Sequence, residues 1–272
     1  MAMGIALVGT ALAGTALVTG GTSGIGAAFA HELAERGYDL VLVARDEARL
    51  ESAAAELRAR GRSVETIAAD LADRADVERV ADRLQSEDRP IELVVNNAGF
   101  GVHALLTDAD TSELDRGMEV MCRTVLVLSG AAGRAMRARG HGQIINVSST
   151  AGFLTMGGYS AIKAWVTSFT ESLAVELKGT GVGVTALCPG WVHTEFHERA
   201  GISAGSIPNA LWIDSEQLVK SCLRDVDKGR VISIPTVRYR ALMWMVRHAP
   251  RSAVRAVSSA LSSNRRHQAA ER

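Results

Sequence analysis

The chain has few cysteines, few aromatic residues and no excess of charge of either sign. Its three cysteines are scattered, and the lack of a Cys-x-x-Cys pair or other metal-ligand spacing argues against a structural zinc site and favours a reducing, cytoplasmic compartment. Because 30 Lys and Arg balance 30 Asp and Glu, no chain-wide attraction to nucleic acid is expected. The 272 residues, 47% hydrophobic and 22% charged, suffice for one globular α/β domain with a sizeable core.

The two ends of the chain differ from the rest in composition. Residues 1–13 are small, apolar and uncharged, without the basic start of a secretory signal. A membrane anchor is the weaker interpretation, because glycines and threonines dilute the run; a packed or disordered extension, or a start codon placed too early, is favoured. Residues 236–272 alternate arginines with large apolar residues and predict a basic amphipathic helical tail. Such a tail suits peripheral contact with a membrane surface, and the alternative is a helix packed on the core or on a second subunit.

Short apolar runs alternate with helical patterns along the middle of the chain. This alternation predicts a Rossmann-like, doubly wound α/β sheet of seven mostly parallel strands with helices on both faces. We expect a single domain over 14–235, including a flap at 191–213 that breaks the alternation. The predicted strands are 15–19, 40–44, 64–68, 91–95, 143–147, 182–187 and 231–234. The predicted helices are 26–36, 46–60, 74–84, 111–139 with an interruption at Gly117, 159–178 and 214–227.

A glycine-rich turn, Thr19-Gly-Gly-Thr-Ser-Gly-Ile-Gly26, joins the first predicted strand to the first helix. Gly20, Gly24 and Gly26 permit a tight turn and close approach of the backbone to a pyrophosphate, and the helix N-terminus adds N–H donors and a positive dipole end. A plain strand–helix turn is the alternative. The position between a strand and a helix favours nucleotide binding.

The end of the second strand indicates which dinucleotide binds. An acid at this point would hold the ribose 2′-hydroxyl, whereas an arginine suits a 2′-phosphate. Ala44 occupies the acid position and Arg45 follows, which predicts NADP(H) over NAD(H). Asp46 is expected to cap the next helix. Asp70, after the third strand, either meets the adenine edge or caps a helix.

Polar residues also follow the next three strands. Asn96-Asn97-Ala98-Gly99 follows the fourth, Ser148-Ser149 the fifth and Cys188-Pro189-Gly190 the sixth. Each could be an ordinary turn. Because the carboxyl ends of parallel strands meet at one edge, where open α/β sheets bind ligands, their convergence indicates one site.

Tyr159 and Lys163 lie four residues apart in a predicted helix and therefore share one of its faces. A free phenol has a pKa of about 10 and exchanges protons poorly near neutrality. An ammonium about 4 Å away would favour the phenolate by roughly 4 kcal/mol at an effective dielectric of about 20. The pair therefore predicts a general acid–base group whose pKa is brought toward about 7.

As an ordered set these motifs resemble the short-chain dehydrogenase/reductase family, over roughly residues 15–195. The resemblance implies that Tyr159 exchanges the proton with the carbinol oxygen, Lys163 lowers its pKa and holds the nicotinamide ribose, and Ser149 hydrogen-bonds the substrate oxygen. Ser148 would point to the opposite face and is the less favoured catalyst. The implied cofactor-binding residues are Gly20, Thr22, Ser23, Gly24, Ile25, Gly26, Arg45, Asp70, Leu71, Asn97, Ala98, Gly99, Tyr159, Lys163, Pro189, Gly190, Val192 and Thr194.

Two features depart from the family pattern. Met121 stands where the family often has an asparagine that supports a proton-relay water, and a thioether cannot replace it well. Ser149 and Tyr159 are ten positions apart, which is short for the family. The loop between them must turn tightly, and Gly157-Gly158 would allow this.

Together these observations predict an NADP(H)-dependent oxidoreductase that interconverts a carbonyl and a secondary alcohol on a hydrophobic or lipid-like small molecule. The alternative is a non-catalytic NADP-binding sensor or scaffold, which Met121 favours and the intact Ser-Tyr-Lys set opposes. The resemblance also implies a homodimer or homotetramer formed through the helices at 111–138 and 159–178. Apolar candidates for the substrate pocket, most of which could equally be core, are Phe153, Leu154, Met156, Trp191, Phe196 and Trp212.

Overall fold

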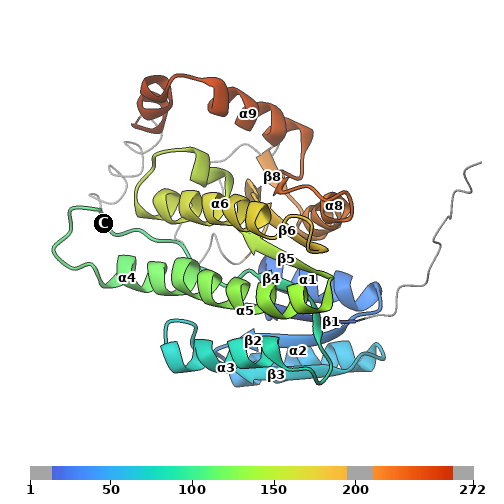
Figure 1. The fold of residues 1–272 in the computed structure, drawn as a ribbon. Coiled ribbons are helices and arrows are strands. Elements are labelled where there is room, and N and C mark those ends of the chain that lie inside the picture. Colours follow the sequence, from blue (N-terminus) through green and yellow to red (C-terminus); the bar gives the residue numbers. More distant parts are fainter. Residues whose placement is uncertain (1–13, 195–210, 260–272) are drawn as a thin grey trace, which may run out of the picture.

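A computed structural model describes residues 14–194 and 211–259 of the chain (Figure 1). The predicted extension at 1–13, the middle of the flap with Phe196, and the end of the tail lie outside these ranges. Among the described residues, no helix combines the length and the apolar composition that crossing a membrane requires.

The central sheet has seven parallel strands in the order β3-β2-β1-β4-β5-β6-β9. This confirms the predicted doubly wound sheet, and the crossover between β1 and β4 marks the point where the strand order reverses. Buried aliphatic side chains alternate to both faces of the strands, as a sheet covered on both sides requires. The strands are β1 Thr15–Thr19, β2 Asp39–Ala44, β3 Val64–Ala68, β4 Ile91–Asn96, β5 Gly142–Val147, β6 Val182–Leu187 and β9 Ile232–Ser233.

Helices cover the sheet in two layers (Figure 1). One core cluster lies between the sheet and α1 Gly24–Glu35, α2 Glu47–Ala59 and α8 Ser215–Asp227. The other contains buried residues of α3 Arg74–Gln85, α5 Thr124–Arg139 and α6 Gly158–Glu176. Aspartates begin three of these helices by accepting backbone N–H groups of the first turn, as expected for Asp46 and Asp214; Asp73 caps α3.

The long helix predicted over 111–139 forms three pieces, and its interruption was predicted at the wrong place. α4 spans Ser112–Met118, a single π turn covers Glu119–Arg123, and α5 follows. Gly117 lies within helix α4. A side chain there would press on Val102 and Ile162, so the small size of this residue serves packing. The pattern of helical hydrogen bonds instead changes around Met121, where one extra residue widens a single turn.

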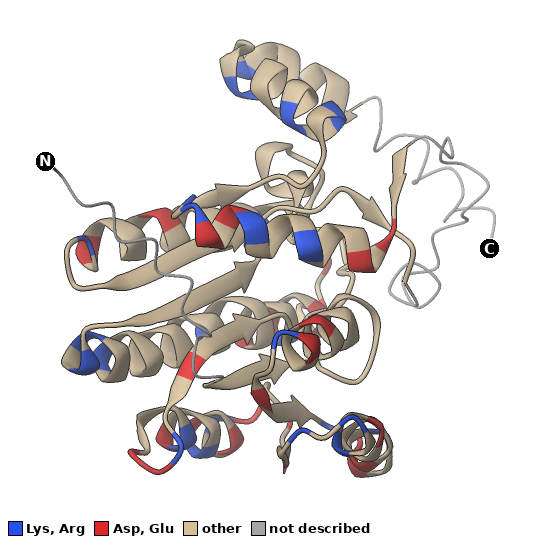
Figure 2. Cartoon of the chain, turned by 90° about the vertical axis from the view of Figure 1, so that its right-hand side faces the viewer, with Lys and Arg blue, Asp and Glu red and all other residues tan. Residues whose placement is uncertain are grey.

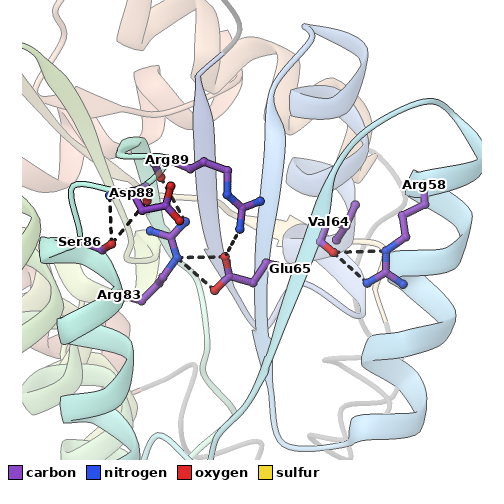
Figure 3. A network of polar contacts seen from close by, with 7 residues as sticks. All are labelled: Arg58, Val64, Glu65, Arg83, Ser86, Asp88 and Arg89. Carbon is purple, nitrogen blue, oxygen red and sulfur yellow. Dashed lines mark hydrogen bonds and ion pairs between the residues drawn. The ribbon is translucent and has the colours of Figure 1, made fainter.

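Arginine contacts hold the free edge of the sheet at β3 (Figure 3). Arg83 of α3 donates to both carboxylate oxygens of Glu65, at 3.1 and 3.0 Å. Arg58 of α2 donates to the carbonyl oxygen of Val64 through two nitrogens, at 3.2 and 2.8 Å. These bonds from the flanking helices satisfy polar groups that an edge strand leaves exposed.

A short parallel pair and a C-terminal helix complete the structure at the carboxyl end of the sheet. β7 Trp191–Val192 pairs with β8 Trp212–Ile213, so the two ends of the predicted flap lie side by side. α9 Val237–His248 follows β9, and residues 251–259 form one more helix. A 3-10 turn at Thr150–Phe153 connects Ser149 to the loop before α6.

Candidate active site

The glycine-rich turn forms a close-packed cradle between β1 and α1. Gly20 and Gly24 have positive φ angles of 65° and 54°, which favour glycine. A side chain at Gly26 would collide with the carbonyl oxygen of Gly20. Ser23 begins α1 without a side-chain cap, and no acid occupies the first turn. The N-terminal N–H groups of α1 can therefore meet an anion.

Asn97 and Thr19 fix the edge of this cradle. The Asn97 side chain donates to the carbonyl oxygens of Thr19 and Gly20, at 3.0 and 3.3 Å. The Thr19 hydroxyl accepts the backbone N–H groups of Asn97 and Ala98, at 2.9 and 3.0 Å. The segment that follows β4 therefore clamps the turn after β1.

The two serines after β5 have different surroundings. Ser148 is buried and donates to the carbonyl oxygen of Lys163 at 2.7 Å, and it also contacts the hydroxyl of Thr167. Ser149 caps the 3-10 turn by accepting the N–H of Ala151 at 3.1 Å, and its side chain is hydrogen-bonded to Tyr159. Ser148 is thus a structural link within the core, and only Ser149 meets the tyrosine.

Lys163 lies within the core beside Tyr159. Its ammonium donates to the carbonyl oxygen of Val147 at 2.9 Å and sits 5.7 Å from the centroid of the Tyr159 ring. The predicted short loop closes through Gly157, whose φ of 93° turns the chain into α6. Tyr159, Ser149 and Lys163 are therefore brought together as predicted, at the carboxyl end of β5.

The protonation of this pair differs from the expectation. Burial raises the pKa of Tyr159 above its ordinary value, and the hydrogen bond with Ser149 only partly opposes this. Burial also lowers the pKa of Lys163 to about 8, against weaker opposing effects of Cys122 and Cys188. The prediction that Lys163 lowers the pKa of Tyr159 is therefore wrong when only the groups of the protein act on it. The ammonium lies over the ring and is bonded to Val147, so desolvation outweighs its field.

Met121 occupies the π turn with its side chain almost fully buried. A side chain on Gly99 would meet the Met121 sulfur at 3.0 Å, so the thioether packs against the Asn-Asn-Ala-Gly segment. Where the family often has an asparagine, this chain therefore has a closely packed apolar side chain. It offers no amide oxygen toward Lys163, whose bond partner in the chain is Val147.

Asp70 forms an ion pair that the sequence did not indicate. Arg116 of α4 donates to both of its carboxylate oxygens, at 3.0 and 2.9 Å, and the N–H of Ala72 donates to one of them. Burial would raise the pKa of Asp70, but the bonds from Ala72 and Arg116 and the nearby charge of Arg45 hold it below its ordinary value. The cap of α3 is Asp73, so the helix-cap alternative for Asp70 is wrong. Leu71, beside it, is buried and accepts the hydroxyl of Thr124 through its carbonyl oxygen.

The Pro189-Gly190 segment is held by α9 and by the loop after Ser149. The carbonyl oxygen of Pro189 accepts the backbone N–H of Thr150 at 2.9 Å. A side chain on Gly190 would collide with the ring of Tyr239, whose hydroxyl accepts the N–H of Trp191 and donates to Leu211. Tyr239 was missed in the sequence because it lies far along the chain in an apparently peripheral tail.

The remaining predicted residues line or support the same edge. Val192 is buried, and Thr194 approaches Gly24, since a side chain on that glycine would meet Thr194 at 3.2 Å. Thr22, Ser23 and Ile25 belong to the turn itself. The proposed pocket residues Phe153, Leu154, Met156, Trp191 and Trp212 are all partly exposed. Trp191 and Trp212 contact each other through tilted rings 6.2 Å apart.

A doubly wound parallel sheet with a glycine cradle after β1 and a Ser-Tyr-Lys cluster after β5 defines a nucleotide-dependent oxidoreductase. The sequence model of the family described as short chain dehydrogenase matches residues 14–203, and the chain belongs to this family. Members use NAD(P)(H), and solved neighbours with NADPH or NADP bound share the fold.

Three similar proteins illustrate the range of this family. A putative ketoacyl reductase of the granaticin polyketide synthase from Streptomyces violaceoruber is 39% identical over 201 residues, which cover 70% of this chain and 72% of that protein. A short-chain dehydrogenase from Sphingobium yanoikuyae, solved with NADPH, superposes with a TM-score of 0.78 at 35% identity and covers 84% of this chain and 92% of its own. A ketone-specific alcohol dehydrogenase from Comamonas testosteroni, described as accepting bulky-bulky ketones, has a TM-score of 0.74 at 29% identity, with 95% and 94% covered.

Proposed function

We propose that this oxidoreductase reduces a hydrophobic ketone to a secondary alcohol, or runs the reverse reaction, with NADP(H) as cofactor. The observation that carries the proposal is the Ser149–Tyr159–Lys163 cluster at the edge that also holds the glycine cradle. The names of the similar ketoacyl reductase and ketone-specific dehydrogenase support a carbonyl substrate.

The residues present fit a dinucleotide. Gly20, Gly24 and Gly26 leave a surface without side chains, and the uncapped start of α1 points at it. The other proposed cofactor contacts are the Asn97–Gly99 segment, Lys163, and the stretch from Pro189 to Thr194. When bound, the nicotinamide would supply or accept the hydride.

The side chains then have separate tasks. Ser149 would hold the substrate oxygen by hydrogen bonding, beside the Tyr159 hydroxyl that donates the proton during reduction. Because burial raises its pKa, Tyr159 is protonated across the neutral range and enters reduction as the acid. Lys163 would keep a positive charge beside the Tyr159 ring and hold the ribose hydroxyls.

The first test removes the acid. We expect Tyr159→Phe to lower turnover at least about 1,000-fold, because general acid catalysis and the oriented proton are both lost, while NADPH affinity stays within a factor of a few. Turnover is measured as NADPH consumption over a panel of ketones and aldehydes, and affinity by NADPH fluorescence. Retained turnover in Tyr159→Phe would overturn the assignment, and a wild type that binds NADPH without consuming it would favour the sensor or scaffold alternative.

The second test concerns the choice of cofactor. Arg45 is exposed at the end of β2 and lies close enough to Asp70 to affect its pKa, which supports a 2′-phosphate site on this side of the turn. We expect Arg45→Ala to weaken NADPH binding about tenfold or more and to leave NADH binding nearly unchanged, because one charge-assisted, bidentate contact is removed. Arg60→Ala, on the surface of α2, is the control. Tighter binding of NADH than of NADPH by the wild type would contradict the proposal.

We also propose a homo-oligomer formed through α5 and α6. Exposed apolar side chains on these helices, Leu126, Trp165 and Val175, support it. Sedimentation of the wild type and of a Val175→Asp variant measures the oligomeric state. A monomeric wild type would contradict the proposed oligomer.

A further inference from the structure

The outward face of α9 is apolar. The helix packs on the protein through Tyr239 and Met243, which are buried. The opposite side carries Val237, Trp244 and Met245, with 70%, 62% and 55% of their surface exposed. At 3.6 residues per turn these three side chains project from the same side, away from the buried pair.

Basic side chains flank this apolar face, and the sequence of α9 itself contains no Asp or Glu. The helical period places Arg240 and Arg247 along one border and Arg238 along the other. Arg251 and Arg255 continue the basic surface on the next helix, and the chain has no Asp or Glu between 228 and 270. Figure 2 shows Lys and Arg without Asp or Glu on these helices, whereas α2, α3 and α8 each carry both signs.

A hollow in this surface is lined by cationic and aromatic groups. Arg240, Trp244, Arg247 and His248 line it together with Ile234 and Met243, so it lies where the border of this face meets the body of the protein, and its volume is about 390 Å³. The Trp244 and His248 rings are 4.5 Å apart, which holds the indole at the rim. The chemistry of the hollow suits a phosphate group beside an apolar chain.

We propose that the outer face of α9, defined by Val237, Trp244 and Met245 with Arg238, Arg240 and Arg247, docks on an anionic lipid bilayer. An apolar strip between arginines suits an interface in which indole and thioether side chains enter the acyl boundary while guanidinium groups meet lipid phosphates. A second copy of the chain is a poorer occupant, because a symmetric contact would place these arginines against their own equivalents.

The position of α9 would bring the bilayer close to the active site. The Tyr239 hydroxyl holds the Trp191 N–H at 3.1 Å, and the N–H of Thr155 donates to the Ser258 hydroxyl at 3.1 Å. The C-terminal helices therefore contact both segments that flank the Ser-Tyr-Lys cluster. This part rests on the proposed function and gives a hydrophobic ketone a route from the membrane to Tyr159.

Binding is tested with the full chain and vesicles, without any turnover. Vesicles of phosphatidylcholine that contain phosphatidylglycerol, at about one anionic lipid in three, are pelleted with the protein, and pure phosphatidylcholine vesicles are the reference. We expect binding to the anionic vesicles that weakens as salt is raised, because exposed charges are screened. Trp244→Ala should lower the partition coefficient about tenfold or more, and Arg240→Gln about fivefold.

Matched variants at other surface positions distinguish binding through this face from nonspecific adsorption to vesicles. Val175→Ala on α6 and Arg137→Gln on α5 remove comparable exposed groups and should leave binding unchanged. NADPH affinity and the thermal midpoint of each variant verify that it is folded. The proposal is overturned if the wild type does not pellet with anionic vesicles, if Trp244→Ala pellets as well as Val175→Ala, or if Trp244→Ala lowers self-association while vesicle binding persists. None of these results depends on turnover, so they test lipid binding independently of the proposed function.

Discussion

At the scale of single residues, the site is governed by burial more than by charge pairing. Tyr159 and Lys163 share a helical face, yet the ammonium is turned toward the Val147 carbonyl and lies over the ring. Desolvation therefore controls both groups, raising the pKa of the phenol and lowering that of the amine. The protein arranges the pair with the phenol as a stable acid and the amine as the more easily titrated member.

This ordering predicts the alkaline limit of catalysis. The pKa of Lys163 is lowered to about 8, so its ammonium is present below that pH and is lost above it. The phenol remains protonated there, because its own pKa is raised. We expect kcat/KM for ketone reduction, and NADPH affinity with it, to fall as pH rises through about 8.

Lys163→Arg provides the comparison, since a guanidinium stays charged throughout the range. We expect the fall in NADPH affinity near pH 8 to disappear in this variant, whatever its turnover. An alkaline limit that stays near pH 8 in Lys163→Arg, or a wild type that stays flat up to pH 10, would contradict the assignment.

At the scale of secondary-structure elements, close approach of backbones shapes the glycine turn, the proposed cofactor site. α1 starts so near to β1 that a Cβ at Gly26 would overlap the carbonyl oxygen of Gly20, and the Asn97 side chain, just after β4, donates to the carbonyl oxygens of Thr19 and Gly20. Three elements therefore meet within one turn. The cradle has no room for even one methyl group.

Gly26→Ala should therefore damage the protein in a specific way. We expect a loss of about 1–3 kcal/mol in the free energy of unfolding, as for other overpacked sites, and a fall of at least about tenfold in NADPH affinity because the turn must shift. Urea unfolding and NADPH titration measure the two effects. Gly130→Ala in α5 is the control, because only the end of the flexible Arg134 lies near it; it should gain about 0.5–1 kcal/mol. Equal behaviour of the two variants would contradict this account of the turn.

At the scale of the whole molecule, the two core clusters enclose all three cysteines. Cys188 and Cys222 belong to the cluster beneath α1 and α8, and Cys122 to the cluster beneath α3 and α5. Burial raises the pKa of the thiols to about 11 for Cys122 and about 12 for Cys188 and Cys222. Thiolates, which are the reactive form, are therefore scarce in the folded protein.

Thiol labelling should report the integrity of both cores. We expect the native protein to react with a disulfide reagent at pH 8 at least about 100-fold more slowly than the chain unfolded in guanidinium, since burial blocks both access and ionisation. Ala55→Cys adds a thiol at an exposed position of α2, away from the proposed subunit interface, and should react at once with a single equivalent. Rapid labelling of the native wild type would show that a core cluster opens readily.

The sequence by itself determined the features that depend on neighbouring residues. Apolar runs gave the strands, aspartates gave the helix starts at α2 and α8, and the glycine pattern gave the turn after β1, because each follows from backbone sterics and hydrogen bonding over a few positions. The choice of Ser149 over Ser148 followed from the alternation of side chains along a strand.

Only the tertiary structure decided the features that depend on burial and on distant contacts. The π turn around Met121, the ion pair of Arg116 with Asp70 and the bonds of Tyr239 to Trp191 and Leu211 each join segments far apart in the chain. The protonation of Tyr159 and Lys163 also belongs here. A four-residue spacing brings the two groups together, but the depth at which the fold places them sets the direction of each pKa.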